Sequence, residues 1–279
     1  MSTTYPCFDV TVSDKVAHIQ LSRPDELNTM IPSFWSDLPV IVSELSARGD
    51  VRAIVISSTG KHFSAGMDLS VFTSSGLSMD GEPGRRNASF MLLVKRLQES
   101  FTALERARVP VLAAIQGGCI GGAVDMVCAA DMGYASQDAY FVIQETNIGM
   151  TADVGTLQRL PKLIPDAIAR ELVYTGRRMP AARAKEVGLV NEVFDDHVSL
   201  VAGVLEIAAE IATKSPLTLW GAKEALVYAR DHGVADSLHQ IALWQTGAFQ
   251  PADMMESFAA KGEKRAPSYE DLPAAPSGI

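Results

Sequence analysis

Three carboxylates stand near a cluster of glycines in the stretch from Gly117 to Asp153. The stretch opens with two glycine pairs, continues into an apolar segment that contains Asp125, and ends with Glu145 and Asp153 in apolar surroundings. A carboxyl group in such surroundings keeps its proton to higher pH, which suits acid and base work near neutral pH. Glycines before a helix leave backbone N–H groups free to face an oxyanion. These residues together favour chemistry on a carbonyl compound that passes through an enolate.

A second loop of small residues, Gly60 to Leu69, follows a buried run and can meet the glycine cluster. The backbone amides of Met67 and Gly122 are the candidates to hold one oxygen from two sides. Two such donors stabilise a developing enolate oxygen by about 3 kcal/mol each, by analogy with known oxyanion holes. The alternative is that both glycine loops are tight turns beside a sheet. The spacing alone does not choose between the two.

Short β-branched runs indicate the strands that position these loops. Phe8–Val12 and Val16–Leu21 have the alternating pattern of a β-hairpin. Ala53–Ser57 and Val109–Ile115 have the apolar character of buried strands, and Tyr140–Gln144 is a further expected strand. Strand, loop and helix therefore alternate, which predicts an α/β core with a largely parallel sheet.

Two helices are predicted in the first half of the chain. Ser33–Ala47 shows helical spacing, although Pro39 predicts an interruption. Ser89–Ala107 predicts an amphipathic helix. The polar segment Ser70–Ala88 between them is expected to be a mobile surface stretch.

From Thr156 onward the chain is predicted to be helical, with one strand at Leu189–Phe194. A soft domain boundary near Ser215 divides a core at residues 1–214 from a C-terminal helical region at residues 215–279. The last helices carry many apolar residues for so little chain, so we expect them to pack on a partner subunit. The predicted helices are Thr156–Leu163, Asp166–Tyr174, Ala181–Val187, Val198–Thr213, Pro216–Asp231, Ala235–Thr246 and Pro251–Gly262.

Composition excludes several classes of protein. The chain has 279 residues, of which 47% are hydrophobic, and its net charge of −9 argues against nucleic-acid or anionic-membrane partners. Three cysteines without metal or redox spacing indicate a reducing compartment, and the first residues lack a signal-peptide pattern, so we predict a cytoplasmic protein. No apolar run has membrane-spanning length. The five histidines form no constellation with each other or with cysteine, so no metal site is expected.

Motifs in order along nearly the whole chain resemble the enoyl-CoA hydratase/isomerase (crotonase) superfamily. The resemblance implies a spiral of ββα turns, a C-terminal helical region that forms trimers or hexamers, and a coenzyme A thioester as substrate with no separate cofactor. It also implies that the amides of Met67 and Gly122 form an oxyanion hole. The matching segments are Leu21-Ser22-Arg23-Pro24, Asn28-Thr29-Met30, Phe63–Leu69, Ala114–Gly122, Gly155–Pro161, Tyr174–Arg177, Gly188-Leu189-Val190-Asn191 and Lys264–Pro267.

The resemblance also suggests which residues contact the thioester. Coenzyme A phosphates are strongly anionic while the chain is acidic, so a few local cations should bind them, and Arg23 and Lys264 are the candidates. Alternatively, each of these two side chains is an ordinary surface charge in contact with solvent. The full set expected to bind the thioester is Arg23, Leu27, Ala65, Gly66, Met67, Asp68, Leu69, Gly118, Gly122 and Lys264.

Members of this superfamily catalyse different reactions on one fold, so the positions of the carboxylates must indicate which reaction this chain catalyses. Hydratases have glutamates where this chain has Asp125 and Glu145, and usually a glycine where it has Asp153. The three acids instead resemble the triad of Δ3,5-Δ2,4-dienoyl-CoA isomerases, which move a proton from C2 to C6 through a dienolate. We expect Glu145 to serve C2 and Asp153 to serve C6, while Asp125 tunes them or orders the thioester.

Other interpretations stay open at this point. The enzyme could hydrate 2-enoyl-CoA with Asp125 and Glu145 holding a water, or the chain could be a non-catalytic acyl-CoA or RNA binder of the same fold. Each acid also has a structural alternative: Asp125 could cap its own helix, Glu145 could lie at the edge of a strand, and Asp153 could cap the helix that begins near Thr156. His62 is expected to be a loop residue rather than a catalyst.

Overall fold

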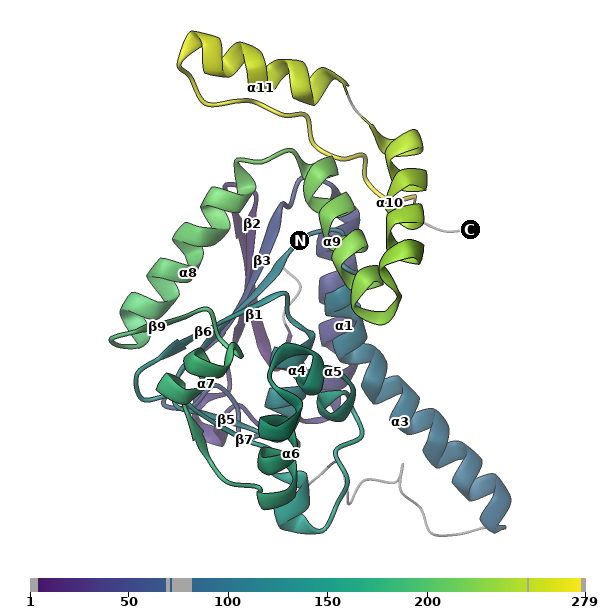
Figure 1. The fold of residues 1–279 in the computed structure, drawn as a ribbon. Coiled ribbons are helices and arrows are strands. Elements are labelled where there is room, and N and C mark those ends of the chain that lie inside the picture. The colour runs from purple at the N-terminus through teal and green to yellow at the C-terminus, as the bar shows by residue number, and fades with distance from the viewer. Residues whose placement is uncertain (1–4, 69–70, 72–81, 250, 277–279) are drawn as a thin grey trace.

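The computed structural model describes residues 5–68, 71, 82–249 and 251–276. A six-stranded sheet with the strand order β1-β2-β3-β4-β6-β9 forms its centre (Figure 1). The hairpin pair β1 and β2 is antiparallel, as predicted, and each later neighbour pairs in parallel. The strands of this sheet are β1 (Phe8–Ser13), β2 (Val16–Leu21), β3 (Ala53–Ser58), β4 (Val111–Ile115), β6 (Met132–Ser136) and β9 (Glu192–Phe194).

A second, three-stranded sheet carries the glycine cluster. It consists of β5 (Gly118–Ile120), β7 (Tyr140–Val142) and β8 (Met179–Pro180). β5 pairs with β7 in parallel, so that Cys119 lies opposite Phe141. The expected strand at Tyr140–Gln144 is therefore two residues shorter, and β5, β6 and β8 were not predicted. They are short and contain glycine or proline, which weakens the local pattern of a strand.

Helices cover both faces of the central sheet. All six residues of β3 are buried, as expected for a strand with both faces covered. On one face, Leu200 and Val204 pack against Val55 and Leu112. On the other face a larger core brings together the aromatic rings of the first long helices. The helices before the C-terminal region are α1 (Pro32–Arg48), α3 (Pro83–Arg106), α4 (Gly122–Ala129), α5 (Thr156–Leu163), α6 (Asp166–Thr175), α7 (Ala181–Val187) and α8 (His197–Ala212), with 3-10 turns η1 (Pro24–Glu26) and η3 (Glu145–Ile148).

The predicted interruption of the first helix is wrong, because α1 runs through Pro39. Proline has no N–H to donate to the carbonyl four residues earlier, which is that of Trp35. The Ser100 hydroxyl of α3 donates to this Trp35 oxygen at 2.8 Å. A neighbouring helix thus replaces the hydrogen bond that the proline removes, and the ring of Trp35 packs at 5.3 Å from that of Phe101.

The helix expected from Ser89 begins earlier, at Pro83. Glu82 caps it by accepting hydrogen bonds from the amides of Gly84 and Arg85, and Pro83 occupies the first turn, where no N–H is needed. Residues 83–88 of the expected surface stretch are therefore helical. The remainder of that stretch, apart from residues 71 and 82, lies outside the described residues.

The first C-terminal helix packs on the core, where the buried Lys223 donates to the carbonyls of Leu104 and Val109, and the two later helices lie apart from the central sheet (Figure 1). α9 (Pro216–Asp231), α10 (Val234–Ala248) and α11 (Pro251–Glu263) follow α8, and α11 projects away from β5, β7 and α4 (Figure 1). The turn between α8 and α9 falls at the proposed boundary near Ser215, although separate domains at residues 1–214 and 215–279 stay a prediction. Large apolar side chains on these helices are exposed, among them Leu226, Val234, Leu238, Leu243, Phe249, Met255 and Phe258. Among the described helices, none is both long and apolar enough to cross a lipid bilayer.

Candidate active site

Two small-residue loops meet beside the second sheet. The Ser64 amide donates to the Gly118 carbonyl, and the Ile120 amide donates to the Ser64 carbonyl, each at 3.1 Å. His62 adds a third link, since its Nδ1 accepts a hydrogen bond from the Gly118 amide at 2.9 Å. His62 thus fixes the position of one loop against the other, in keeping with its expected place as a loop residue.

Glycines allow this close approach. Gly66 has φ +87°, and a Cβ there would lie 2.6 Å from the Ile120 carbonyl and 3.5 Å from the Gly122 nitrogen. Gly66 and Gly122 therefore bring the amide of Met67 and that of Gly122 to neighbouring positions. Within the part of the chain that the structure describes, neither amide has a hydrogen-bond acceptor. Both are free for a ligand oxygen, while their role as an oxyanion hole stays a prediction.

Asp125 lies in the first turn of α4 and is fully buried. Its Oδ1 accepts a hydrogen bond from the Thr156 amide at 2.5 Å, whereas its Oδ2 is buried without a partner among the described residues. Burial raises the pKa of Asp125 to about 6, and Thr156 opposes this through its hydrogen bonds. Asp125 thus supports the start of α5 rather than capping its own helix.

Glu145 opens the 3-10 turn η3 instead of standing at the edge of a strand. Its Oε1 lies 3.3 Å from where a Cβ on Gly121 would be, so this carboxyl group borders the loop that carries the Gly122 amide. Burial, together with the nearby charges of Asp125 and Asp153, raises the pKa of Glu145 to about 7. A carboxyl group with this pKa can both take and return a proton near neutral pH.

Asp153 lies in the loop between η3 and α5 and is half-buried. Burial raises its pKa as well, and its charge in turn raises that of Asp125. The alternative role of Asp153 as cap of α5 is not observed. The cap position belongs to Gly155, which has no side chain to use, and the free Thr156 amide is taken by Asp125. The fold therefore gathers the three predicted acids and leaves Asp153 without that structural task.

The expected thioester contacts fall into two groups. Leu27 and Asp68 border the first loop, with the Ala65 amide donating to the Leu27 carbonyl at 3.0 Å. Arg23 lies next to them, where its Nη1 donates to the Thr29 carbonyl at 2.7 Å. Lys264 directly follows α11, which projects away from β5, the strand that is hydrogen-bonded to the first loop (Figure 1).

Two further expected contacts have special positions. Both backbone polar groups of Gly118 are already used, by His62 and Ser64, so only its surface is left for a thioester. Leu69 lies outside the described residues. The thioester-binding role of each expected residue stays a prediction.

Two side chains that contact the backbone of the loop containing Asp153 were not predicted from the sequence. Gln98 of α3 donates a hydrogen bond to the Asp153 carbonyl, and Nη1 of Arg159 in α5 lies 3.5 Å from the Val154 carbonyl oxygen. Arg159 stands in a matched motif but had no assigned task, and Gln98 has no local signal. Among the described residues no group of three or more histidine, cysteine, aspartate or glutamate side chains is placed to hold a metal ion.

Known proteins share both the sequence and the fold. The sequence profile described as enoyl-CoA hydratase/isomerase matches residues 11–272. A mouse protein named Delta(3,5)-Delta(2,4)-dienoyl-CoA isomerase, mitochondrial, is 41% identical over 94% of this chain and 81% of its own. Its peroxisomal namesake from Arabidopsis thaliana is 39% identical over 92% of this chain and 93% of its own.

A solved structure supports the same relationship at the level of the fold. An enoyl-CoA hydratase from Bacillus anthracis superposes with a TM-score of 0.84 at 29% identity, covering 94% of this chain and 98% of that one. The predicted α/β fold with a C-terminal helical region is thereby confirmed as crotonase-like. On these matches and on the fold, this chain is an enzyme that belongs to the enoyl-CoA hydratase/isomerase family.

Proposed function

We propose that the enzyme converts 3,5-dienoyl-CoA to 2,4-dienoyl-CoA. The observation that carries the proposal is the third acid, Asp153, which lies close enough to Asp125 and Glu145 for its charge to raise the pKa of both. The relatives named dienoyl-CoA isomerase support the same substrate class. An acyl-CoA substrate fits the family, and the isomerase reaction places it in fatty acid breakdown.

The proposed reaction moves one proton at each end of the diene. The Glu145 carboxylate takes a proton from C2, and the electron pair of that C–H bond spreads into a dienolate. The amides of Met67 and Gly122 hold the thioester oxygen, where the charge gathers, at about 3 kcal/mol per donor. Protonated Asp153 then delivers its proton to C6, and the double bonds settle at positions 2 and 4.

The acids need opposite protonation states for this sequence. Repulsion between them favours states in which one carboxyl is ionised and another protonated, and with the pKa of Glu145 at about 7 its ionised form is well populated at neutral pH. After turnover Glu145 is protonated and Asp153 is ionised, and a proton passing between them or through water restores the start. The reaction as proposed uses no cofactor beyond the coenzyme A of the substrate. Asp125 assists by holding α5 and by repelling charge on the other two acids.

Turnover of two thioesters tests the proposal directly. The purified enzyme is given 3,5-dienoyl-CoA, and the conjugated product is followed by its ultraviolet absorbance, with 2-enoyl-CoA assayed for hydration in parallel. We expect isomerisation to have the higher kcat/KM. Hydration that exceeds isomerisation would replace the proposal by a hydratase, and turnover of neither thioester would refute both.

The assembly and the cellular location are separate matters. We propose a trimer or a pair of trimers, because the exposed apolar side chains of α9 to α11 need a partner surface. The cytoplasmic location stays a prediction. The mitochondrial and peroxisomal locations in the names of the relatives belong to those proteins.

A further inference from the structure

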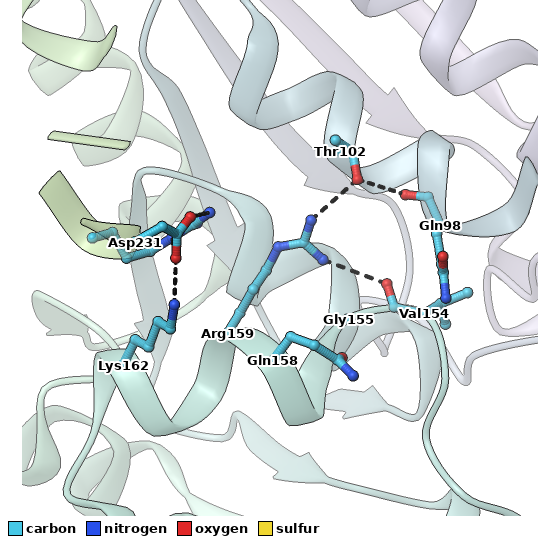
Figure 2. A pocket seen from close by; sticks show the side chains of 9 residues that line it. Gln98, Thr102, Val154, Gly155, Gln158, Arg159, Lys162 and Asp231 are labelled. Carbon is cyan, nitrogen blue, oxygen red and sulfur yellow. Dashed lines mark hydrogen bonds and ion pairs between the residues drawn. The ribbon is translucent and has the colours of Figure 1, made fainter. Parts of the chain in front are cut away.

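A cavity of about 300 Å³ lies behind the loop that carries Asp153 (Figure 2). It is bordered by α3, α5 and the end of α9, and the backbone of Val154 and Gly155 forms part of its wall. A cavity offers no packing atoms, so this stretch of backbone is held on that side by polar contacts. The lining residues are Gln98, Thr102, Val154, Gly155, Gln158, Arg159, Lys162, Arg230 and Asp231.

Gln98 holds the first of these backbone groups. Its Nε2 donates a hydrogen bond of 2.7 Å to the carbonyl oxygen of Asp153 itself. The Gln98 backbone carbonyl in turn accepts from the Thr102 hydroxyl at 3.0 Å, within α3 (Figure 2). The peptide plane that follows Asp153 is thus fixed from α3, which lies beside it at the edge of the cavity.

Arg159 holds the next peptide group. Its Nη1 lies 3.5 Å from the Val154 carbonyl, and a Cβ on Gly155 would be only 1.9 Å from that nitrogen. Gly155 also has φ +141°, so the backbone conformation favours glycine, and a side chain there would push the guanidinium group away. The guanidinium group therefore lies directly against the backbone that joins Asp153 to α5.

The position of Arg159 is itself fixed by an ion pair. Its Nε and Nη2 donate to the two carboxylate oxygens of Glu105 at 3.0 and 2.9 Å, a fork geometry that sets its plane. The two side chains are only 11% and 10% exposed. Arg230 of α9 also pairs with Glu105 and with Asp231, which links the C-terminal helices to the same group.

We propose that Gln98 and Arg159 are positioning residues, which aim the Asp153 carboxyl at the far carbon of the substrate by fixing the carbonyls of Asp153 and Val154. This inference rests on the proposed function in assigning Asp153 to C6. Neither side chain touches the reacting atoms. Both act through the backbone. Because Glu105 pairs with Arg230 as well as with Arg159, the position of Arg159 also depends on how α9 packs.

The sharpest test replaces Gln98 by methionine, which keeps the length and loses the donor. We expect kcat for isomerisation to fall about tenfold with KM unchanged, because a displaced acid slows proton transfer without weakening binding. Gln158→Met is the matched control. Gln158 lines the same cavity, and its side chain makes no hydrogen bond within the described part of the chain, so the kcat of the Gln158→Met enzyme should stay within about twofold of the wild type.

A double variant separates positioning from a general loss of structure. If Gln98 acts through Asp153, adding Gln98→Met to Asp153→Asn should cause no further loss of kcat. A residue with a merely structural role would lower kcat in both backgrounds. Additive losses, or a wild-type kcat in the Gln98→Met enzyme, would overturn the inference.

Hydrogen exchange gives a readout that needs no substrate. In Gln98→Met, and in Arg159→Lys, which keeps the charge but loses the planar fork, amides in residues 153–160 should exchange at least about tenfold faster than in Gln158→Met. Unchanged exchange in both variants would refute the positioning role even if the isomerase activity is confirmed. A wild-type enzyme inactive on 3,5-dienoyl-CoA would refute the function while the exchange result still decides whether these residues hold the loop.

Discussion

The helix that carries Asp125 and the helices that end the chain differ in how much of their surface one chain buries. Every residue of α4 from Gly122 to Ala129 is buried, whereas α10 has no buried residue. On α10 and α11, Leu238 is 64% and Phe258 61% exposed. Burying such a side chain contributes about 1.5–3 kcal/mol, so the C-terminal helices hold a driving force that a single chain leaves unused.

The difference indicates a division of tasks within the molecule. The three acids and the two free amides are placed by contacts inside one chain, and the bond between Asp125 and Thr156 is an example. The C-terminal helices instead present apolar surface and, directly after α11, Lys264. We therefore expect the chemistry to depend on contacts within the chain, and assembly and part of coenzyme A binding to depend on neighbouring copies.

The largest expected effect lies in the site. Asp153→Asn keeps the shape of the side chain and removes its proton, so isomerisation should fall by about 10²–10⁴-fold, the loss typical of an acid or base. Folding and thioester binding should survive, and any hydration of 2-enoyl-CoA should be much less affected because Glu145 and both amides remain. A folded Asn variant with near-normal isomerase kcat would remove Asp153 from the mechanism.

The second effect concerns the stability of the buried acid group. The pKa of Glu145 is raised from 4.5 to about 7, so the folded state binds more protons than the unfolded state between those pH values. The free energy of unfolding should therefore fall as pH rises through that window, by up to about 3 kcal/mol. Glu145→Gln should lack this part of the fall and be the more stable protein at pH 8.

Urea unfolding at pH 5 and pH 8, at one protein concentration, measures this difference. The remaining slope of the Gln variant should come mainly from Asp125, whose pKa is raised to about 6. If wild type and Glu145→Gln lose equal stability between the two pH values, burial within the single chain does not raise the pKa of Glu145.

The third effect concerns the exposed apolar surface of the C-terminal helices. Leu238→Asp and Phe258→Asp place a charge on the exposed apolar surface, so association should weaken by about 10–100-fold, from the 1.5–3 kcal/mol of burial that each side chain would lose. Light scattering at micromolar concentration measures the molar mass. Val198→Asp on α8, even more exposed in one chain but outside the C-terminal region, is the control and should leave the assembly intact. A wild-type monomer would contradict the expected assembly.

The smallest effect concerns coenzyme A. Lys264→Ala should raise KM for a CoA thioester about fivefold, the value of about 1 kcal/mol for an exposed charge pair, with kcat nearly unchanged. Lys261→Ala, on α11 itself, is the matched control and should have no effect. Arg23→Ala should raise KM in the same way from the side of the first loop. Unchanged affinity in both the Lys264 and the Arg23 variants would refute the cation assignment.

Much of the fold follows from local patterns. The hairpin at β1 and β2, the buried strands β3 and β4, and most helices after Thr156 were expected within a few residues of their observed bounds. Apolar periodicity carried these predictions, because it depends on neighbours in the chain. The short strands β5, β6 and β8 escaped prediction because pairing with distant strands, rather than their own residues, makes them strands.

The candidate site, too, was predicted in part from the sequence and decided in part by contacts between distant segments. The sequence by itself determined which residue types were present in a recognisable order: three acids, two glycine loops and the family motifs around them. Only the tertiary structure decided that Asp125 holds the start of α5, that Ser100 compensates for Pro39, and that Gln98 supports the loop of Asp153. Each of these contacts joins groups from different helices or loops. A hydrogen bond between distant segments depends on how whole elements pack, and no local spacing of residues encodes that packing.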